Sequence, residues 1–296
     1  MSIKTLKLSE AEPKPRHVAI GTFDGVHLGH RQVIDSAETV VSFDPHPVAV
    51  LHPDAAPKLL TPLSLKARLL DEIGVEELVL IEFNEEFAHM DAEQFVRHVL
   101  IERLGATKVS VGENFRFGFK AQGDPDFLKT FDEFETRVVP LVEQGDEIVS
   151  STQIRGVVAA GDVKRASELL GYPFTMVGTV EHGDKRGREL GFPTANLVPD
   201  EHDVVPGHGV FAALTNGVPS AVNVGIRPTF VTGRGLLVES YLIDWSGDLY
   251  DQQIEIAFLE RMRGERRYDT VEALVDQMNR DVEIARGICE RALAEA

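Results

Sequence analysis

The sequence predicts an α/β domain built on a parallel sheet, followed by a small antiparallel β-barrel and a C-terminal helix. Up to about residue 150, short apolar runs alternate with longer stretches of helical period, which is typical of βαβ units. After Gly171 and Pro173 the chain changes to β-rich runs separated by turn signals. A length of 296 residues fits two cores. We therefore expect two domains, 1–171 and 172–296.

The first domain has five β-rich runs with helical stretches between them. The runs are HVAI, TVVSF, ELVLIEF, TKVSVG and TRVVPLV, and the helices cover 31–38, 64–73, 92–104 and 124–134. Two further helical segments, 153–160 and 162–170, end the domain. The connection between the HVAI and TVVSF runs is close to the minimum length that two parallel strands need, because the TVVSF run follows His30 so closely.

The second domain has six β-rich runs, which favour a small closed barrel. They are FTMVGTVEHG, ANLVP, GVFAALT, PSAVNVG, LLVESYLID and QQIEIAFLE. The Asn216-Gly217 pair predicts a two-residue hairpin between the third and fourth runs. A helix should follow, with Asp269 as its N-cap, Glu272 three residues later and apolar positions that step by three and four.

Composition limits the classes of partner. The formal net charge is −18, so the overall field repels nucleic acid and anionic lipid. No signal peptide and no run of apolar residues long enough to span a membrane is evident. We therefore expect a soluble cytoplasmic protein that binds neither nucleic acid nor a membrane. The single cysteine, Cys289, excludes an internal disulfide; it shares a helical stripe with Val282 and Ala285, which predicts a buried structural thiol.

The stretch GTFDGVHLGH, residues 21–30, follows the first strand of the expected sheet. Its glycines allow a sharp turn and close approach of a ligand to the backbone, and the helix that follows favours an anion. His27 and His30 could hold a metal, a proton or a phosphate. Zinc needs further ligands, and no matching cluster lies nearby in the sequence. Polyphosphate is therefore the favoured ligand.

GTFDGVHLGH resembles the H-x-G-H signature of the nucleotidyltransferase superfamily. Together with FDPHP at 43–47, VGENFRFG at 111–118 and SSTQIR at 150–155, it resembles the adenylyltransferase module of the bacterial bifunctional riboflavin kinase/FAD synthetases. The resemblance implies a Rossmann-like nucleotidyltransferase domain with three kinds of site residue. These are catalytic His27, His30 and Arg155; ATP-binding Gly21, Phe23, Asp24, Gly29, Ser151 and Thr152; and flavin-binding Asn114, Phe115 and His46.

A second constellation is GTVEHGDKRGRELGFPTANL, residues 178–197. It contains neither a P-loop nor the signature set of a protein kinase. Its glycines and its basic residues make a flexible, positively charged loop, and Thr194 and Asn196 offer neutral oxygens. Such oxygens suit Mg²⁺ only when phosphates complete its octahedron.

This run resembles the riboflavin kinase signature, as do NVGIRPTF, VESYLID and GDLYDQQIEI further along. The resemblance implies a riboflavin kinase β-barrel with ATP, Mg²⁺ and flavin sites and a catalytic base. The residues it implies are Thr194 and Asn196 for Mg²⁺ and ATP phosphates, Gly183, Lys185 and Arg188 for ATP, Arg227 for flavin, and Glu239 as the base.

The residue pattern around Glu239 leaves two interpretations open. Strand alternation places Glu239 on one face with Leu237, Tyr241 and Ile243. Burial on that face would raise the pKa of the carboxyl toward that of a working base. Alternatively, the carboxylate lies at a barrel end and reaches water.

The two resemblances imply one chain with two activities. The barrel would phosphorylate riboflavin to FMN with ATP and Mg²⁺, and the α/β domain would transfer AMP from ATP to FMN, giving FAD and pyrophosphate. One alternative is a riboflavin kinase with a weak or inactive adenylyltransferase domain. Others are a flavin-binding protein without catalysis and nucleotide transfer to another phosphate, which leaves the barrel unexplained.

Overall fold

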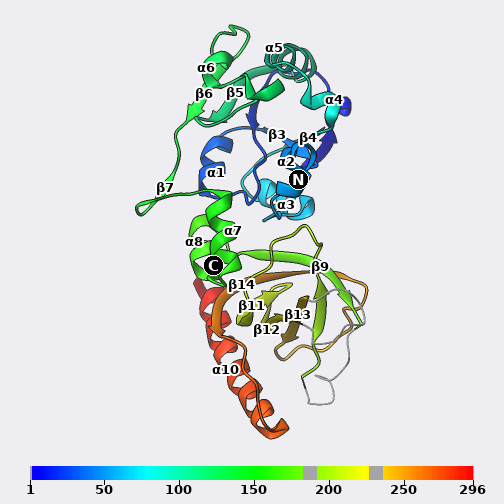
Figure 1. The fold of residues 1–296 in the computed structure, drawn as a ribbon, viewed down its shortest axis with the longest axis vertical. Coiled ribbons are helices and arrows are strands. Elements are labelled where there is room, and N and C mark those ends of the chain that lie inside the picture. Colours follow the sequence, from blue (N-terminus) through cyan, green and yellow to red (C-terminus); the bar gives the residue numbers. More distant parts are fainter. Residues whose placement is uncertain (1, 183–191, 227–235, 296) are drawn as a thin grey trace. The chain divides into compact units, whose positions relative to one another are not determined.

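The computed structural model describes residues 2–182, 192–226 and 236–295. The chain forms two compact units, Met1–Ser151 and Thr152–Ala296 (Figure 1). Four of the predicted ligand-binding residues lie outside the described residues: Gly183, Lys185, Arg188 and Arg227.

The described part of the first unit contains a parallel sheet in the order β1-β4-β3-β2-β5-β6. The strands are β1 (Lys4–Lys7), β2 (Arg16–Ile20), β3 (Thr39–Asp44), β4 (Glu77–Glu82), β5 (Ala106–Gly112) and β6 (Glu135–Val139). The five predicted strands are confirmed. The sequence pattern did not reveal β1, which adds an edge strand beside β4, nor the small hairpin of β7 (Glu143–Gln144) and β8 (Glu147–Ile148).

Short helices connect these strands. They are α1 (Leu28–Ile34), α2 (Pro47–Leu51), α3 (Leu63–Glu72), α4 (Glu85–Ala88), α5 (Ala92–Gln94) with the π-helical η3 (Phe95–Arg103), and α6 (Pro125–Leu128), with short 3-10 turns at η1 (Leu8–Glu10), η2 (Pro53–Ala55) and η4 (Phe119–Ala121). The helix expected over 124–134 is shorter, since α6 ends at Leu128. The chain that follows packs Phe131 and Phe134 against the core instead of continuing the helix. The short first crossover still closes a parallel pair, since α1 begins as early as Leu28.

The strand order reverses beside β2. The chain builds β2, β3 and β4 outward on one side and then returns to place β5 against the other side of β2. In open α/β sheets, ligands bind outside the carboxyl ends of the strands at such a switch point. The C-terminal ends of β2 and β5 therefore mark the expected binding edge.

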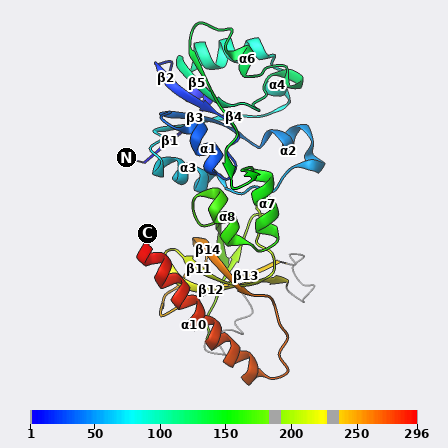
Figure 2. The ribbon, with the colours of Figure 1, turned by 90° about the vertical axis from the view of Figure 1, so that its left-hand side faces the viewer.

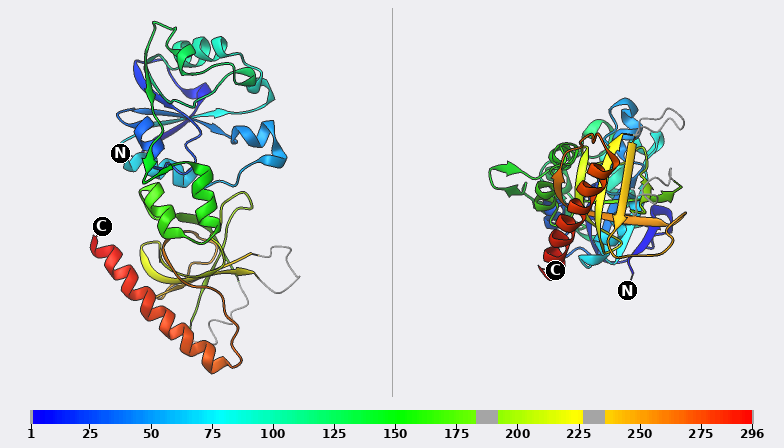
Figure 3. Two further views of the ribbon diagram at one scale, coloured as in Figure 1. Left: turned by 60° about the vertical axis from the view of Figure 1, so that its left-hand side comes forward. Right: turned by 90° about the horizontal axis from the view of Figure 1, so that it is seen from below.

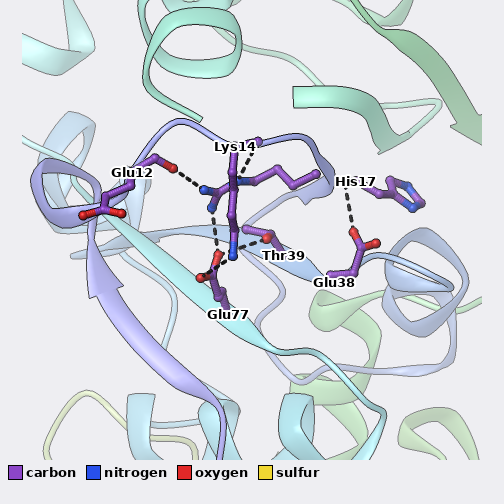
Figure 4. Close-up of polar contacts among 7 residues, drawn as sticks. Glu12, Lys14, His17, Glu38, Thr39 and Glu77 are labelled. Carbon is purple, nitrogen blue, oxygen red and sulfur yellow. Dashed lines mark hydrogen bonds and ion pairs between the residues drawn. The ribbon is translucent and has the colours of Figure 1, made fainter. Parts of the chain in front are cut away.

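The opposite edge of the sheet carries a polar cluster. The Arg16 guanidinium, buried at the start of β2, donates to Glu77 at 2.8 Å, and Lys14 donates to the same carboxylate at 2.9 Å. The Thr39 hydroxyl lies 3.4 Å from it (Figure 4). Burial by itself raises the pKa of Glu77, but the hydrogen bond from Lys14 and the charge of Arg16 outweigh it and lower the pKa. The cluster thus joins the first residues of β2, β3 and β4.

The described part of the second unit contains helices and a closed antiparallel barrel in the order β10-β13-β12-β11-β14-β9. The elements are α7 (Ser151–Ala159), α8 (Val163–Leu170), β9 (Thr175–Glu181), β10 (Ala195–Val198), β11 (Gly209–Thr215), β12 (Val218–Ile226), β13 (Leu236–Leu242), β14 (Gln253–Arg263) and α10 (Val271–Glu295). All six predicted strands are confirmed. Asn216 and Gly217, with φ of 48° and 80°, form the predicted hairpin turn between β11 and β12.

Helix α10 packs on the outside of the barrel against β11, β12 and β14 (Figures 2 and 3). The Arg263 guanidinium at the end of β14 makes hydrogen bonds to both carboxylate oxygens of Asp281. The predicted buried thiol is confirmed: Cys289 is buried and its Sγ donates to the Ala213 carbonyl at 3.3 Å. The expectation that Asp269 caps this helix is wrong by one residue. The cap is Thr270, because its hydroxyl is the group that accepts the Ala273 N–H, at 3.1 Å.

Among the helices that the structure describes, none is long and apolar enough to cross a membrane.

Candidate active sites

The first candidate site begins where β2 ends. The chain turns there with left-handed backbone at Phe23, Gly25 and Val26, with φ of 47°, 93° and 36°. Such conformations cost about 1–3 kcal/mol at non-glycine residues and persist only where surrounding contacts impose them. Gly21 starts the turn, and a Cβ there would lie 3.0 Å from the Phe23 ring. The turn is therefore a strained feature that its surroundings hold in place.

Asp24 holds this turn from inside. Its Oδ1 accepts the backbone N–H groups of Leu60 at 2.9 Å and Thr61 at 3.1 Å. The Thr61 hydroxyl in turn accepts the Gly25 N–H at 3.0 Å. The Ser151 hydroxyl donates to the Asp24 carbonyl at 2.8 Å. Two predicted phosphate-binding residues, Asp24 and Ser151, thus make contacts that shape the turn.

The two histidines lie side by side at the end of the turn. His27 is the N-cap of α1, and its Nδ1 accepts the His30 N–H at 3.3 Å. In a neutral ring this leaves the proton on Nε2. The rings stack with centroids 3.5 Å apart and planes 19° apart, and the Phe23 ring meets His30 edge-on. A Cβ at Gly29 would lie 3.2 Å from the His27 ring, so glycine leaves room for the imidazole. His27, His30, Phe23 and Gly29 are therefore brought together.

Stacked rings do not converge on one ion as metal ligands do. Within the part of the chain that the structure describes, no group of three or more His, Cys, Asp or Glu side chains could hold a metal. The contact at His27 Nδ1 agrees with a role of that ring as a hydrogen-bond donor at Nε2.

Two other predicted segments follow the neighbouring strands. His46 comes after β3, and its Nδ1 accepts the Val48 N–H at 3.2 Å as the N-cap of α2. Asn114 and Phe115 come after β5, where Phe115 stacks on Phe117 with centroids 5.4 Å apart. Because β2, β3 and β5 are adjacent and parallel, these segments share one edge of the sheet with the histidine turn.

The SSTQIR segment forms the start of α7. Ser151 is the first residue of this helix, and Thr152 and Arg155 follow in its first turns, in the second compact unit. Residues four apart in a helix share a face, so Ser151 and Arg155 lie on the same side of α7.

The second candidate site is a row of polar side chains across the barrel strands. Asn196 on β10 pairs with Glu239 on β13 and, on its other side, with Glu181 on β9. Glu239 also pairs with Asn223 on β12. Directly opposed residues in antiparallel strands share a face. The row therefore places two carboxylates and two amides on four adjacent strands.

This row lies on the outer face of the barrel. Val238 and Ser240, the neighbours of Glu239 in sequence, are fully buried, whereas Glu239 is partly exposed. The predicted sharing of a face by Glu239 and Tyr241 agrees with this alternation. Asn196 is 8% exposed, and Thr194, which precedes β10, is partly buried.

Three acidic or amide residues at this site were not among the predicted ones. Glu181 and Asn223 enter through strand pairing, which the sequence pattern does not reveal. The Glu265 carboxylate lies close to Gly225 of β12, in space that a Cβ would fill. In the sequence, the only sign of this close approach is the glycine at position 225.

The chain combines a sheet that has a histidine-bearing turn at its switch point with a barrel that carries an Asn–Glu row, and this combination fits a two-domain transferase of nucleotide-type ligands. Family models agree: residues 9–153 match FAD synthetase and residues 170–289 match riboflavin kinase. The chain belongs to the bifunctional riboflavin kinase/FMN adenylyltransferase family.

Relatives with that description resemble the chain over most of its length. One from Listeria monocytogenes is 35% identical and covers 91% of both chains, and one from Escherichia coli is 35% identical and covers 94% of both. A crystal structure from Streptococcus pneumoniae, described as a macrolide-efflux protein, has a TM-score of 0.86 at 31% identity and covers 96% of this chain and 99% of that one. The chain is thus a transferase with two activities. It phosphorylates riboflavin to FMN and adenylylates FMN to FAD.

Proposed function

We propose that adenylyl transfer takes place at the switch point of the sheet, with His27, His30 and Arg155 as its catalytic residues. The observation that carries this assignment is the stacked histidine pair on a strained turn between β2 and α1. The imidazoles donate hydrogen bonds to the α-phosphate of ATP as an FMN phosphate oxygen attacks it. Such donors act where charge develops in the transition state.

The other residues of this site bind and position the substrates. The Ser151 and Thr152 hydroxyls and the Arg155 guanidinium hold the departing pyrophosphate through charge-assisted hydrogen bonds. Gly21, Phe23, Asp24 and Gly29 shape the turn that receives ATP. Asn114, Phe115 and His46, which follow the adjacent strands, bind the flavin.

We propose that riboflavin phosphorylation takes place at the outer-face row of the barrel, with Glu239 as the catalytic base. The supporting observation is the pairing of Asn196 with Glu239 on adjacent strands. The carboxylate accepts the proton of the terminal ribityl hydroxyl as that oxygen attacks the γ-phosphorus of ATP; the bond to the bridging oxygen breaks and ADP leaves. Gly183, Lys185 and Arg188 bind ATP and Arg227 binds the flavin in this proposal, on the resemblance of their motifs alone.

Mg²⁺ fits the donors at this second site. Thr194 and Asn196 offer hydroxyl and amide oxygens, with the Glu239 carboxylate opposite Asn196. Mg²⁺ prefers oxygen ligands and is usually held by few protein groups together with substrate phosphates. When bound, the ion offsets charge on the ATP phosphates. Thr194 and Asn196 are its proposed protein ligands.

A crossover experiment with two variants tests both assignments. Purified protein is given either riboflavin or FMN, with ATP and Mg²⁺, and the flavins are separated by chromatography. His30→Ala should lower FAD formation from FMN by about 10²–10³-fold and leave FMN formation unchanged. Glu239→Gln should lower FMN formation by about 10²–10⁴-fold and leave FAD formation from supplied FMN unchanged.

The matched controls are exposed residues of the same type in the same compact units. His98→Ala removes an exposed histidine of η3, and Glu260→Gln an exposed carboxylate of β14; both should keep the two activities. Wild-type FAD formation by His30→Ala, or wild-type FMN formation by Glu239→Gln, would contradict the assignment of that site.

We also propose that the protein works in the cytoplasm on riboflavin, FMN and ATP, without a nucleic-acid or membrane partner. Its net charge of −18 supports this proposal, because the overall field repels polyanionic surfaces.

The expected domains are residues 1–171 for adenylyl transfer and 172–296 for phosphorylation.

A further inference from the structure

A lysine is buried beneath the histidine turn. Lys66, on α3, is only 9% exposed as a residue. Its Nζ donates to the Thr22 carbonyl at 2.8 Å and lies 3.5 Å from the Ser42 hydroxyl. The Ser42 hydroxyl donates to the same carbonyl at 3.0 Å. Lys66 therefore supports Thr22, the residue just before the first left-handed position, Phe23.

The charge of Lys66 is balanced by carboxylates that belong to the same edge of the sheet. Burial lowers the pKa of Lys66, and the carboxylates of Asp24 and Asp44 act against that effect. Asp24 lies inside the turn and Asp44 ends β3, two residues before His46. A buried ammonium is tolerated where hydrogen bonds and opposite charges compensate it. Lys66 has its contacts with Thr22 and Ser42 and the favourable charges of Asp24 and Asp44.

The ligands of this edge are themselves strongly anionic. ATP and FMN both present phosphates, and the chain carries a net charge of −18. Without a cation, Asp24 and Asp44 would repel the ligands that the turn receives, because juxtaposed like charges weaken binding. A fixed positive charge behind the turn offsets this repulsion without occupying the ligand's place.

We propose that Lys66 is a positioning residue for adenylyl transfer, whose buried ammonium holds the turn at Thr22 and offsets the carboxylates of Asp24 and Asp44 toward polyanionic substrates. The proposal rests on the placement of adenylyl transfer at this turn. Lys66 acts through the turn and its field, and it makes no contact with the reacting atoms in this proposal.

Three variants test the two parts of this role. Lys66→Met removes both the charge and the donor, whereas Lys66→Gln removes the charge and keeps an N–H donor for Thr22. Both should raise the KM for ATP in FAD synthesis at least about tenfold. Adding Asp44→Asn to Lys66→Gln removes one repelling carboxylate, so it should recover part of the ATP affinity. A role limited to packing would not respond to that second change.

Riboflavin kinase activity and circular dichroism of the same samples report folding. Lys129→Met is the control, because this exposed lysine pairs with Asp126 at the surface of the same unit. The proposal is overturned if well-folded Lys66→Gln keeps the KM for ATP within twofold of wild type. It is also overturned if Asp44→Asn brings no recovery. His30→Ala separates the two hypotheses. Normal FAD synthesis by His30→Ala contradicts the placement of adenylyl transfer at this turn. If His30→Ala loses FAD synthesis while Lys66→Gln keeps the wild-type KM for ATP, only the role of Lys66 is contradicted.

Discussion

At the scale of single residues, His27 combines a structural contact with a proposed catalytic one. Its Nδ1 accepts the His30 N–H as the N-cap of α1, and this contact leaves Nε2 as the donor nitrogen of the neutral ring. The same ring packs against His30 and leaves space only for a glycine at position 29. Cap and donor are separate functions of one imidazole, so substitutions can separate them.

We predict that His27→Asn and His27→Ala differ in stability and agree in activity. Asparagine is a good N-cap and keeps an oxygen for the His30 N–H, whereas alanine loses the cap at a cost of about 1 kcal/mol. Both lack the Nε2 donor, so both should lose FAD synthesis by about 10²-fold or more. Urea unfolding and flavin chromatography measure the two effects. Full FAD synthesis by His27→Asn would show that the cap alone matters.

Lys66 shows at this scale what a sequence does not reveal. The sequence identified both histidines, because a short glycine-rich motif carries them. Lys66 stands in an amphipathic helix, where a lysine normally faces water. Its burial arises from packing α3 against the ends of β2 and β3, a contact between segments more than twenty residues apart.

At the scale of elements, the two edges of the parallel sheet have different tasks. The carboxyl ends of β2, β3 and β5 carry the candidate site, and the amino ends of β2, β3 and β4 carry the cluster around Glu77 (Figure 4). Arg16 in this cluster is almost fully buried, so its pairing with Glu77 is protected from solvent. The cluster should therefore affect stability and leave the reaction unchanged.

We predict that Glu77→Gln lowers the free energy of unfolding of the first unit by about 3 kcal/mol at neutral pH, because it leaves Arg16 with a neutral partner. The folded-state pKa of Glu77 is lowered, so its contribution is present above the ordinary value of 4.5 and is lost as pH falls through the folded-state pKa. Urea unfolding at several pH values should show the difference between wild type and variant shrinking below pH 4.5. A difference that is independent of pH would contradict this assignment.

Periodicity predicted most elements, and its failures have physical causes. The strand β1 is rich in lysine and exposed along most of its length, so no apolar alternation marks it. At α10, Asp269 and Thr270 both have side chains that can cap, and only the three-dimensional position of the Ala273 N–H selects Thr270. The row of Glu181, Asn196, Glu239 and Asn223 depends on strand register, which is set by the closed barrel rather than by any local motif.

At the scale of the whole molecule, the chain divides into units that each have their own core. The boundary along the chain falls after Ser151, so α7 and α8 group with the barrel. Within the second unit, α8 packs against β14. A domain that begins at residue 172 would lack this helix.

We predict that a fragment of residues 152–296 is more stable than one of residues 172–296, because α8 buries Val163, Ala166, Leu169 and Leu170. Thermal unfolding of the two fragments measures the difference. Riboflavin kinase assays show whether either fragment retains phosphorylation. Equal stability would place the boundary of the folding unit at 171, as the change in sequence texture indicates.

The lone thiol, on the buried face of α10, gives this chain a built-in reporter of local opening. Cys289 is fully buried, and burial raises the pKa of its thiol, so a thiol-reactive dye can modify it only when the helix lifts from the barrel. The labelling rate then measures the free energy of that opening, as amide exchange does for backbone groups. Since the sequence contains one cysteine, every labelled molecule reports the same event, and bound flavin or nucleotide that steadies the barrel should slow the labelling.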